Sequence, residues 1–337
     1  MSAGTVAHVV RSNSFAGVER YITETAAELS RRGWSVTVIG GDQRRMTAGL
    51  PAGVNHRPGA TVAQVSRALA ALGRCDIVHA HMTAAELPAA LLKWRYQGRL
   101  FVTRHFATAR GRSPLGKLAR PIIGRQVDTQ IAISRFVADS LGEPSTVIYN
   151  GVRPAAGPQS ARSNTVILLQ RLEVEKDAPT ALRAWSESRL AAEGWRLVIY
   201  GRGTQERALR DLTGQLCIAE SVHFGGFLDD TRAALSRAAV MVAPAPAEPF
   251  GLAVVEAMAE GTPVIAAGGG GHLETVGSEQ VFFTPGDASG CAELLGRLAH
   301  SPELRQTLGD RMRLRANKLF TITAHVDALE ACYLPQG

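Results

Sequence analysis

The sequence predicts an α/β protein with two Rossmann-like, doubly wound domains that face a central cleft. Short β-branched runs alternate with longer segments of helical periodicity, and this alternation is typical of βα units and mainly parallel sheets. The rhythm is interrupted at residues 153–164, which are rich in Pro, Gly, Ser and Ala, and then begins again. The length of 337 residues suits two domains of ~150 residues each.

The first domain is expected over residues 1–152. Its first strand is predicted at Thr5–Val10 and its first helix at Gly17–Arg32, where Gly33 ends the helix. Further strands are predicted at Ser35–Ile39, Asp76–Ala80, Leu100–Thr103 and Thr129–Ile133. Ligands of such sheets bind at the carboxyl ends of the strands, so we look for chemistry in the loops that follow strands.

The second domain is expected over residues 165–318 and repeats the same rhythm. Its strands are predicted at Thr165–Leu169, Arg196–Tyr200, Val222–Phe224, Val240–Val242 and Pro263–Ala266. Its helices are predicted at Ala178–Leu190, Gln205–Leu212, Thr231–Ala238 and Leu252–Ala259. Residues 319–337 are expected to form a last helix that can return to the first domain.

The composition indicates a cytoplasmic protein. Hydrophobic residues make up 45% of the chain, and no apolar run approaches the ~20 residues that span a bilayer. The N-terminus lacks the basic-then-apolar layout of a signal peptide. The four cysteines are far apart and form no CxxC pair, so we interpret them as reduced thiols, neither zinc ligands nor disulfides.

The basic charge is concentrated in the first half of the chain. Residues 1–150 contain 19 Lys and Arg against 9 Asp and Glu, and Lys93–Arg125 contains nine basic residues and no acid. This stretch is either a solvated face or a patch that attracts an anionic partner. No nucleic-acid motif is present and aromatics make up only 6%, which argues against nucleic acid. An anionic membrane surface, with the protein peripheral to it, or a phosphorylated acceptor fits better.

Two acids flank the start of a helix in EPFGLAVVEAMAEGTPVIA, residues 248–266. Glu248 follows a strand and precedes Pro249, which places it outside the helix. The helix start supplies amides suited to phosphate oxygens, those of Phe250, Gly251 and Leu252. Glu256, about one turn deeper, can bind the vicinal diol of a ribose. Alternatively, Glu248 is a helix cap and Glu256 a solvated acid, but the apolar neighbours of Glu256 argue that it needs a polar ligand.

Two cations follow the first strand of the second domain. Arg171 and Lys176 lie in RLEVEKDAPT, between that strand and the next helix. Cations at such a position can neutralise a diphosphate. The alternative is a surface ion-pair network with Glu173 and Glu175, and the residues alone leave both interpretations open.

Three glycine-containing stretches offer weaker signals. The turn Gly201–Gly203 resembles a nucleotide-binding turn but lacks a third glycine. Phe227 in HFGGFLDD could form the wall of a base pocket or belong to a plain connection. Gly268 to Gly271 permit close approach of the backbone to a ligand.

The first domain offers a glycine and a histidine at strand ends. Gly17 allows a tight turn after the first strand, and the amides of the next helix point into the cleft. His105 follows the strand LFVT and could donate to a sugar hydroxyl or a departing phosphate, although a lone histidine is more often structural. His79 and His81 have a spacing that would suit a metal, but no third ligand is evident. Ser134 is interpreted as a helix N-cap because no GxSxG is present.

Together these stretches resemble the family 4 glycosyltransferases, retaining enzymes with the two-domain GT-B fold. Glu248 and Glu256 match the E-x7-E signature of that family, and the RLxxEK loop starts at Arg171. The GxG turn, FxGF near Phe224, ISRF near Ser134 and NGV at Asn150 follow in the order of the family. The resemblance covers nearly the whole chain.

The resemblance implies transfer of a sugar from a nucleotide-diphosphate sugar, with UDP favoured over GDP, to an acceptor that the sequence does not identify. It implies that Arg171 and Lys176 stabilise the leaving diphosphate, that Glu256 binds the ribose, and that Glu248 binds sugar hydroxyls. The remaining implied contacts are Gly17, His105, Phe250, Gly251 and Leu252. Gly201, Gly203 and Phe227 are added as candidate donor contacts from their own stretches of sequence. Retention of the anomeric configuration is implied, and no metal or other cofactor, because the two cations replace Mg²⁺.

The sequence departs from the family pattern in the first loop, where Ala16-Gly17 replaces two glycines, and in its short C-terminus. Three other functions are compatible with such domains. A dehydrogenase is disfavoured because no GxGxxG follows the first strand. A non-catalytic sugar-nucleotide-binding protein is the second. Another GT-B enzyme, such as a phosphorylase or an epimerase, is the third, and no cofactor lysine supports a phosphorylase.

Overall fold

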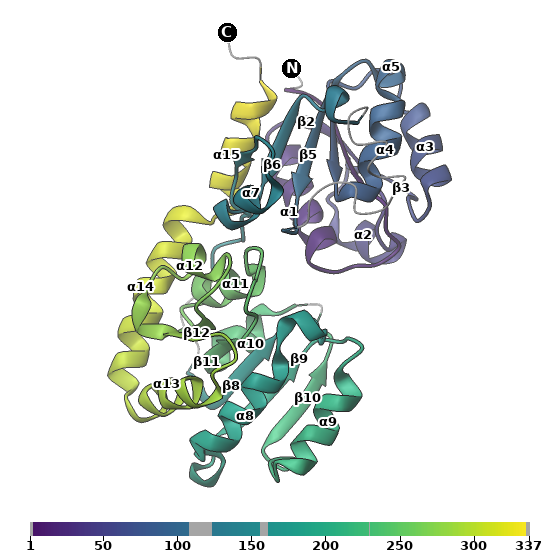
Figure 1. Ribbon diagram of the computed structural model, residues 1–337. Coiled ribbons are helices and arrows are strands. Elements are labelled where there is room, and N and C mark those ends of the chain that lie inside the picture. The colour runs from purple at the N-terminus through teal and green to yellow at the C-terminus, as the bar shows by residue number, and fades with distance from the viewer. Residues whose placement is uncertain (1–2, 108–122, 156–160, 229, 335–337) are drawn as a thin grey trace. The chain divides into compact units, whose positions relative to one another are not determined.

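The computed structural model describes residues 3–107, 123–155, 161–228 and 230–334. The chain divides into two compact units. The N-terminal unit contains Met1–Gly151 and Ile322–Gly337, and the C-terminal unit contains Val152–Thr321 (Figure 1). Residues 156–160 of the expected linker lie outside the described residues, and the first strand of the C-terminal unit begins at Ser163.

The N-terminal unit is built on a seven-stranded parallel sheet with the order β3-β2-β1-β4-β5-β6-β7. The strands are β1 (Gly4–Val10), β2 (Trp34–Ile39), β3 (Asn55–Arg57), β4 (Ile77–His81), β5 (Arg99–Arg104), β6 (Thr129–Ala132) and β7 (Thr146–Val147). The strand order reverses between β1 and β4, which is the switch point where doubly wound sheets bind ligands. The loops after β1 and β4 therefore lie at this switch point, and the loop after β5 follows the neighbouring strand.

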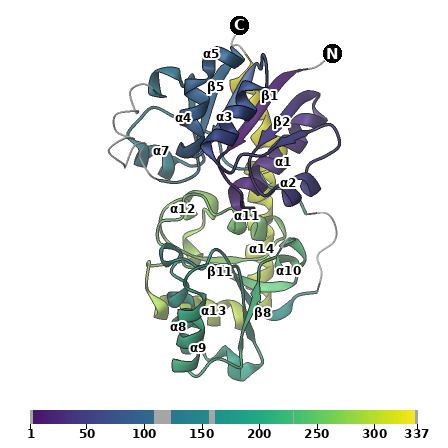
Figure 2. The same ribbon diagram turned by 90° about the vertical axis from the view of Figure 1, so that its right-hand side faces the viewer.

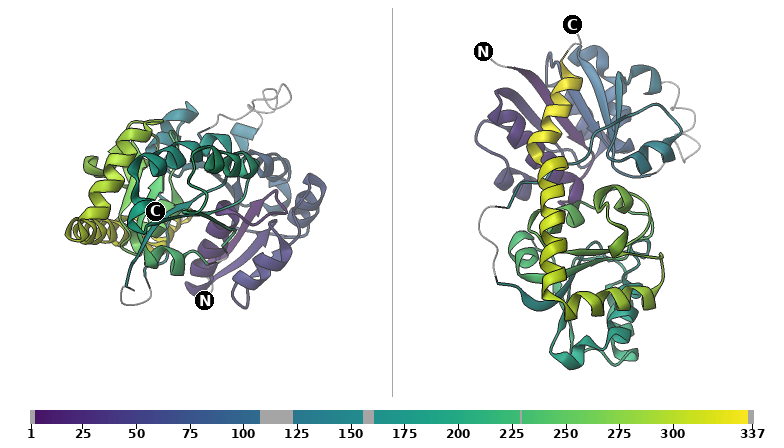
Figure 3. Two further views of the ribbon diagram at one scale, coloured as in Figure 1. Left: turned by 90° about the horizontal axis from the view of Figure 1, so that it is seen from below. Right: turned by 90° about the vertical axis from the view of Figure 1, so that its left-hand side faces the viewer.

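Helices cover both faces of this sheet. The helices are α1 (Gly17–Arg31), α2 (Gln43–Gly49), α3 (Val62–Ala70), α4 (Thr83–Leu91), α5 (Lys93–Tyr96), α7 (Arg135–Leu141) and α15 (Ile322–Tyr333). Side chains of α1 and α15 share one hydrophobic core with β1 and β2. Side chains of α3, α4 and α5 share a second core with β1, β4 and β5. Figure 3 shows α15 lying along the sheet of the N-terminal unit.

Polar contacts also attach α15 to the N-terminal unit. Arg32 Nη1 lies 2.6 Å from Asp327 Oδ1 and 2.7 Å from Glu330 Oε2. Trp34 Nε1 donates a hydrogen bond of 2.7 Å to Glu330 Oε1. The last helix is thus a structural part of the unit that the first residues form.

The C-terminal unit is built on a six-stranded parallel sheet with the order β10-β9-β8-β11-β12-β13. The strands are β8 (Ser163–Leu169), β9 (Arg196–Tyr200), β10 (Val222–Gly226), β11 (Ala238–Ala243), β12 (Val264–Ala267) and β13 (Phe282–Phe283). The α-helices are α8 (Ala178–Ser188), α9 (Glu206–Gln215), α10 (Arg232–Arg237), α11 (Leu252–Ala259), α12 (His272–Thr275), α13 (Ala288–His300) and α14 (Pro302–Leu319). Short 3₁₀ helices span Val174–Lys176, Leu190–Glu193 and Glu279–Val281. Helix α8 packs against α9 and α13, and α11 packs against α10 and α14 (Figure 2).

The predicted fold of two doubly wound α/β domains is confirmed. The strands that the sequence pattern missed are β3, β7 and β13, which have only three, two and two residues and so show no periodicity. Ser134 caps α7 as predicted, because its Oγ accepts a hydrogen bond of 3.0 Å from the Val137 amide. Among the described helices, none is both long enough and apolar enough to cross a bilayer. The four cysteines are free thiols.

Candidate functional site

A largely buried ion pair joins two loops at the carboxyl end of the C-terminal sheet. Lys176 Nζ lies 2.6 Å from Glu248 Oε2, and the two side chains are only 14% and 16% exposed. Lys176 ends the 3₁₀ turn after β8, and Glu248 follows β11, the neighbour of β8 in the sheet. The two strands therefore place a cation and an acid side by side.

The glycine run fixes the position of Glu248. The Gly271 amide donates a hydrogen bond of 2.6 Å to the Glu248 carbonyl. A Cβ on Gly270 would lie 2.6 Å from that same oxygen, and one on Gly269 would lie 2.1 Å from the Pro246 carbonyl oxygen. Close approach was expected between the glycine run and a ligand, and the structure shows that the run closely approaches the loop that contains Glu248.

Arg171 lies in the loop after β8 that also contains Lys176, and its side chain is exposed. Its side chain is 49% exposed, and its Nη2 lies 2.7 Å from Glu175 Oε1. Glu173 does not join this pair, because its carboxylate accepts hydrogen bonds from the amide and hydroxyl of Thr204. The alternative surface ion pair is thus formed by Arg171 and Glu175, whereas Lys176 contacts Glu248.

Gly201 and Gly203 are required by the protein backbone. A Cβ on Gly201 would lie 1.8 Å from the Gln170 carbonyl oxygen, and its φ of +137° also favours glycine. A Cβ on Gly203 would lie 2.2 Å from the Leu172 carbonyl oxygen. These glycines let the turn after β9 press against the loop that holds Arg171, so contact with a ligand is not needed to explain them.

Glu256 was expected to need a polar ligand because its neighbours are apolar, and in the structure a protein hydroxyl is one polar partner. Glu256 is half-buried on α11, and its Oε2 accepts a hydrogen bond of 2.9 Å from Thr231 Oγ1. Helix α11 begins at Leu252, after Gly251 with a φ of +86°. The Phe250 side chain is buried against Phe320, so only its backbone can reach a ligand. The half-buried Phe227 directly follows β10.

The sequence analysis missed His272, which lies beside this loop. Its buried imidazole bonds the Ala267 carbonyl through Nδ1 at 3.2 Å, and its Cδ2 would lie 3.3 Å from a Cβ on Gly251. Burial lowers the pKa of His272, while the nearby charge of Glu248 opposes this shift. The signal in the sequence was a histidine directly after the glycine run.

Gly17 begins α1. Hydrogen bonds account for the conformation of the preceding loop, but no packing contact among the described residues requires a glycine at this position. The Ala16 amide donates a hydrogen bond of 2.9 Å to the carboxylate of the buried Glu19, which closes the turn after β1. A Cβ on Gly17 would meet no atom within 4 Å. Folding of the N-terminal unit therefore does not demand glycine here, and the space beside the Cα of this exposed residue is open.

His105 follows β5 and is buried together with other histidines. Its Nε2 lies 3.2 Å from Nδ1 of His81, and its ring packs edge-on against Tyr21 at a centroid distance of 5.1 Å. Burial, with a smaller contribution from the charge of His325, lowers the pKa of His105 to about 3. His105 is therefore neutral at physiological pH and can donate from one ring nitrogen.

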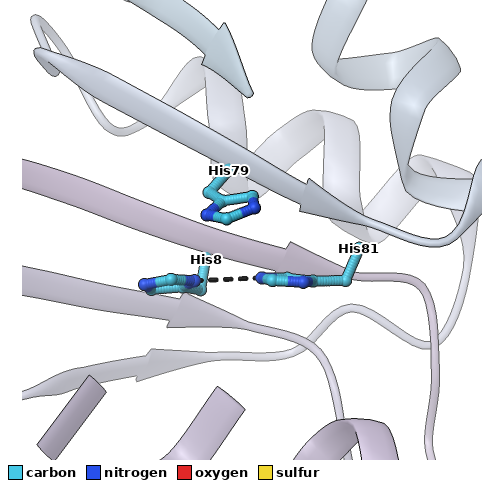
Figure 4. A group of neighbouring side chains, drawn as sticks. All are labelled: His8, His79 and His81. Carbon is cyan, nitrogen blue, oxygen red and sulfur yellow. Dashed lines mark hydrogen bonds between the residues drawn. The ribbon is translucent and has the colours of Figure 1, made fainter. Parts of the chain in front are cut away.

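A third histidine that the sequence analysis missed lies next to His79 and His81. His8 of β1 is paired in register with His79 of β4, and ring nitrogens of the three residues lie within 4.8 Å of one another. Figure 4 shows His8 and His81 joined edge to edge, with His79 above them. The signal in the sequence was a histidine within the first strand.

These three histidines fit a hydrogen-bonded network better than a metal site. Both ring nitrogens of His79 are engaged, one with the hydroxyl of Tyr333 and one at 2.6 Å from Thr103 Oγ1. The rings of His79 and His81 are stacked, with centroids 4.5 Å apart and an interplanar angle of 26°. Nearly parallel rings do not direct their lone pairs at one point, as tetrahedral ligation requires.

The structure describes residues 93–107 and 123–125 of the basic stretch Lys93–Arg125. Its members Arg110, Arg112, Lys117 and Arg120 lie outside the described residues. Arg104 is buried and pairs with Glu86 at 2.5 Å, so it does not belong to a surface patch. Lys93 is paired with Asp128 at 2.5 Å.

The buried histidines predict that acid destabilises the N-terminal unit. Burial lowers the pKa of His8 and His105 to about 3 and that of His325 to about 4, and those of His79 and His81 lie well below 6.5. The unfolded chain binds more protons below pH 6.5, so each histidine removes roughly 1.4 kcal/mol of unfolding free energy per pH unit of acidification. Urea unfolding at pH 7 and pH 5, resolved by hydrogen exchange of peptides, should show this loss in the N-terminal unit. Equal stability of that unit at both pH values would contradict it.

Two family models match the chain. Residues 154–315 match glycosyl transferases group 1, and residues 15–156 match glycosyltransferase family 4. The glycogen synthase of Mycobacterium tuberculosis is 32% identical over 286 residues, which cover 77% of this chain and 69% of that protein. The phosphatidyl-myo-inositol mannosyltransferase of Mycobacterium leprae is 31% identical over 256 residues, which cover 69% of this chain and 67% of that protein.

Solved structures confirm the fold. Anabaena HepE, solved in complex with UDP and glucose, superposes with a TM-score of 0.81 and 18% identity, covering 98% of this chain and 99% of that one. The matched models span both units, and the two relatives named above are each more than 30% identical to this chain and are covered over two thirds of their length. The chain therefore belongs to the GT-B glycosyltransferases of the family 4/5 type, and glycosyl transfer is its class of reaction.

Proposed function

We propose that this protein transfers a sugar from a UDP-sugar to an acceptor hydroxyl with retention of the anomeric configuration. The main support is the Lys176–Glu248 pair, a largely buried cation and acid on adjacent strand ends. A UDP donor is favoured because HepE was solved both with UDP and with UDP-glucose. The acceptor is a hydroxyl compound of unassigned class.

In the proposed reaction, the bond between the anomeric carbon and the diphosphate oxygen breaks. The acceptor oxygen forms the new bond on the same face, and its proton passes to the leaving phosphate. Negative charge grows on the diphosphate in the transition state, so fixed cations stabilise that state most. Lys176 is held in place by Glu248, and the exposed Arg171 can exchange Glu175 for a phosphate. These two cations would supply the positive charge of a metal ion, and we propose that no metal is required.

The acids and amides are proposed to orient the donor. Glu248 uses one oxygen for Lys176 and can accept from sugar hydroxyls with the other. Glu256, beside Thr231, would accept hydrogen bonds from the ribose diol. The amides at the start of α11 would face sugar or phosphate oxygens. The N-terminal unit would contribute the amide of Gly17 and the imidazole of His105.

Removal of either cation tests the leaving-group role. We expect Arg171→Ala and Lys176→Ala to reduce turnover by roughly 10²–10³-fold, as is typical when a donor to a developing anion is lost. Release of UDP from UDP-glucose and other sugar nucleotides, measured with EDTA present, provides the readout. Glu175→Ala is the matched control, because it removes the partner of Arg171 and keeps the cation.

Wild-type turnover by Arg171→Ala and Lys176→Ala would refute the proposed role of the cations. Loss of wild-type turnover in EDTA that is restored by added Mg²⁺ or Mn²⁺ would refute metal independence. Tight binding of UDP-sugars without any turnover would favour the alternative of a non-catalytic sugar-nucleotide-binding protein.

Gly17→Ala tests the approach of a phosphate to α1. The added Cβ meets no protein atom within 4 Å, and alanine is a better helix former than glycine by up to about 1 kcal/mol. We therefore expect an unchanged or raised melting temperature. The KM for the sugar nucleotide should rise by about tenfold, equivalent to ~1.4 kcal/mol of lost binding. An unchanged KM would remove Gly17 from the donor site.

We also propose that an anionic membrane surface contacts the N-terminal unit. Three exposed apolar side chains lie at i, i+4 and i+7 along α4 and α5, with exposures of 37% for Leu87, 57% for Leu91 and 68% for Trp94. The exposed Arg95 adjoins the Trp94 ring at 5.7 Å. Apolar side chains beside cations match the chemistry of an anionic lipid surface.

Vesicle binding tests this surface. We expect co-sedimentation with vesicles that contain phosphatidylglycerol, weaker binding at high salt, and a loss of at least about threefold for Leu91→Ser with Trp94→Ser. Leu314→Ser on α14 is the matched control, because Leu314 is an exposed leucine (71%) of the C-terminal unit. Binding that is insensitive to salt and to anionic lipid content would exclude the proposal.

A further inference from the structure

Three buried imidazoles form a continuous hydrogen-bonded chain in the N-terminal unit. His8 Nδ1 lies 2.9 Å from His81 Nε2, and His81 Nδ1 lies 3.2 Å from His105 Nε2. The three side chains come from β1, from the end of β4 and from the residue after β5, and all are buried. The chain therefore runs from the middle of the sheet to its carboxyl end, where His105 lies.

The two hydrogen bonds that link His8, His81 and His105 must both be donated in the same direction. Each ring is neutral at physiological pH and has one N–H, because burial lowers the pKa of all three histidines. His81 has two hydrogen bonds and one N–H, so it donates in one bond and accepts in the other. Either all donors point from His8 toward His105, or all point from His105 toward His8.

The far end of His8 favours one of these two directions. Its Nε2 is buried and has no hydrogen-bond partner among the described residues. Buried N–H groups without an acceptor are rarer in folded proteins than acceptors without a donor. The hydrogen of His8 therefore lies on Nδ1, and His81 in turn donates from Nδ1 to His105 Nε2. In that arrangement the single hydrogen of His105 lies on its Nδ1.

His79 has different hydrogen-bond partners, although it lies two residues before His81 on β4 and its ring stacks on that of His81. Its nitrogens contact the Tyr333 and Thr103 hydroxyls and not His105. His79 and His81 are equally buried, at 0% exposure. His79 is thus a matched control for the loss of a buried histidine that does not touch His105.

We propose that His8 and His81 are positioning residues that hold His105 as a donor at Nδ1, with Nε2 occupied by His81. The inference rests on the proposed function, in which His105 faces the transferred sugar. A neutral imidazole has one nitrogen-bound hydrogen. When that hydrogen is fixed on Nδ1, His105 can donate a hydrogen bond to the substrate. If the two hydrogen bonds ran in the opposite direction, Nδ1 of His105 would present a lone pair to the substrate. His105 could then no longer donate a hydrogen bond to the substrate from Nδ1.

Asparagine and glutamine at position 81 separate the two hydrogen bonds. An asparagine amide lies near the place of Nδ1 and can still bond His105, whereas a glutamine amide lies near the place of Nε2 and can bond only His8. We expect His81→Asn to retain kcat for UDP release within about threefold, and His81→Gln and His81→Phe to lose at least about tenfold, as expected when a tautomer is no longer fixed. His79→Phe should lower the melting temperature as much as His81→Phe does and leave kcat near that of the wild type.

The ¹⁵N spectrum of histidine-labelled protein supplies a readout that does not depend on activity. The wild type should show His105 as one neutral tautomer with the hydrogen on Nδ1, assigned by the signals missing from His105→Phe. In His81→Gln, the two nitrogens of His105 should shift toward averaged values, which indicate a mixture of tautomers.

The outcomes distinguish failure of this inference from failure of the proposed function. A wild-type His105 with its hydrogen on Nε2, or nitrogen shifts typical of a bound metal, would overturn the inference whatever the activity. Equal kcat in the asparagine and glutamine variants would also overturn it. His105→Phe could turn over at the wild-type rate while the ¹⁵N spectrum of the wild type shows His105 with its hydrogen on Nδ1. The proposed role of His105 in the reaction would then be refuted, and the assignment of its tautomer would stand.

Discussion

The ion pair between Lys176 and Glu248 is the interaction on which the C-terminal site depends. A pair that is mostly removed from water is favourable only when its geometry is fixed in advance, because both ions lose hydration. Here the geometry is fixed by backbone. The Gly271 amide bonds the Glu248 carbonyl, and Gly269 and Gly270 allow their loop to lie against residues 246–248. Side chains at these glycines would force the loops apart and separate the acid from the cation.

In the N-terminal unit, buried histidines form hydrogen bonds with one another and with neighbouring hydroxyl groups, and no ion pair is involved in these contacts. His79, His81 and their neighbours form hydrogen bonds to one another and to tyrosine and threonine hydroxyls. A neutral imidazole tolerates such a place when its N–H has an acceptor, and the buried Nε2 of His8, which has no partner among the described residues, then holds a lone pair. The same condition that makes this core acceptable at neutral pH makes it sensitive to acid, and it also restricts which hydrogen His105 can offer.

The sequence predicted the long elements well because periodicity accumulates over many residues. The helix at Leu252–Ala259 and the strand at Arg196–Tyr200 have the predicted bounds. Contacts between distant segments were not predictable. Nothing local indicates that Thr231 bonds Glu256, or that the glycines near residues 201 and 270 pack against other loops. His8 was missed for the same reason, since its place beside His79 depends on the parallel register of β1 and β4.

The last helix has a consequence for biosynthesis. Ile322, Val326, Leu329 and Tyr333 complete the same hydrophobic core as β1 and α1, more than 280 residues earlier in the chain. A ribosome releases the N-terminus first, so the opening strands emerge long before the helix that closes their core. The nascent N-terminal unit must wait with one apolar face uncovered until Ile322–Tyr333 has been synthesised, whereas Val152–Thr321 can fold as soon as it leaves the exit tunnel.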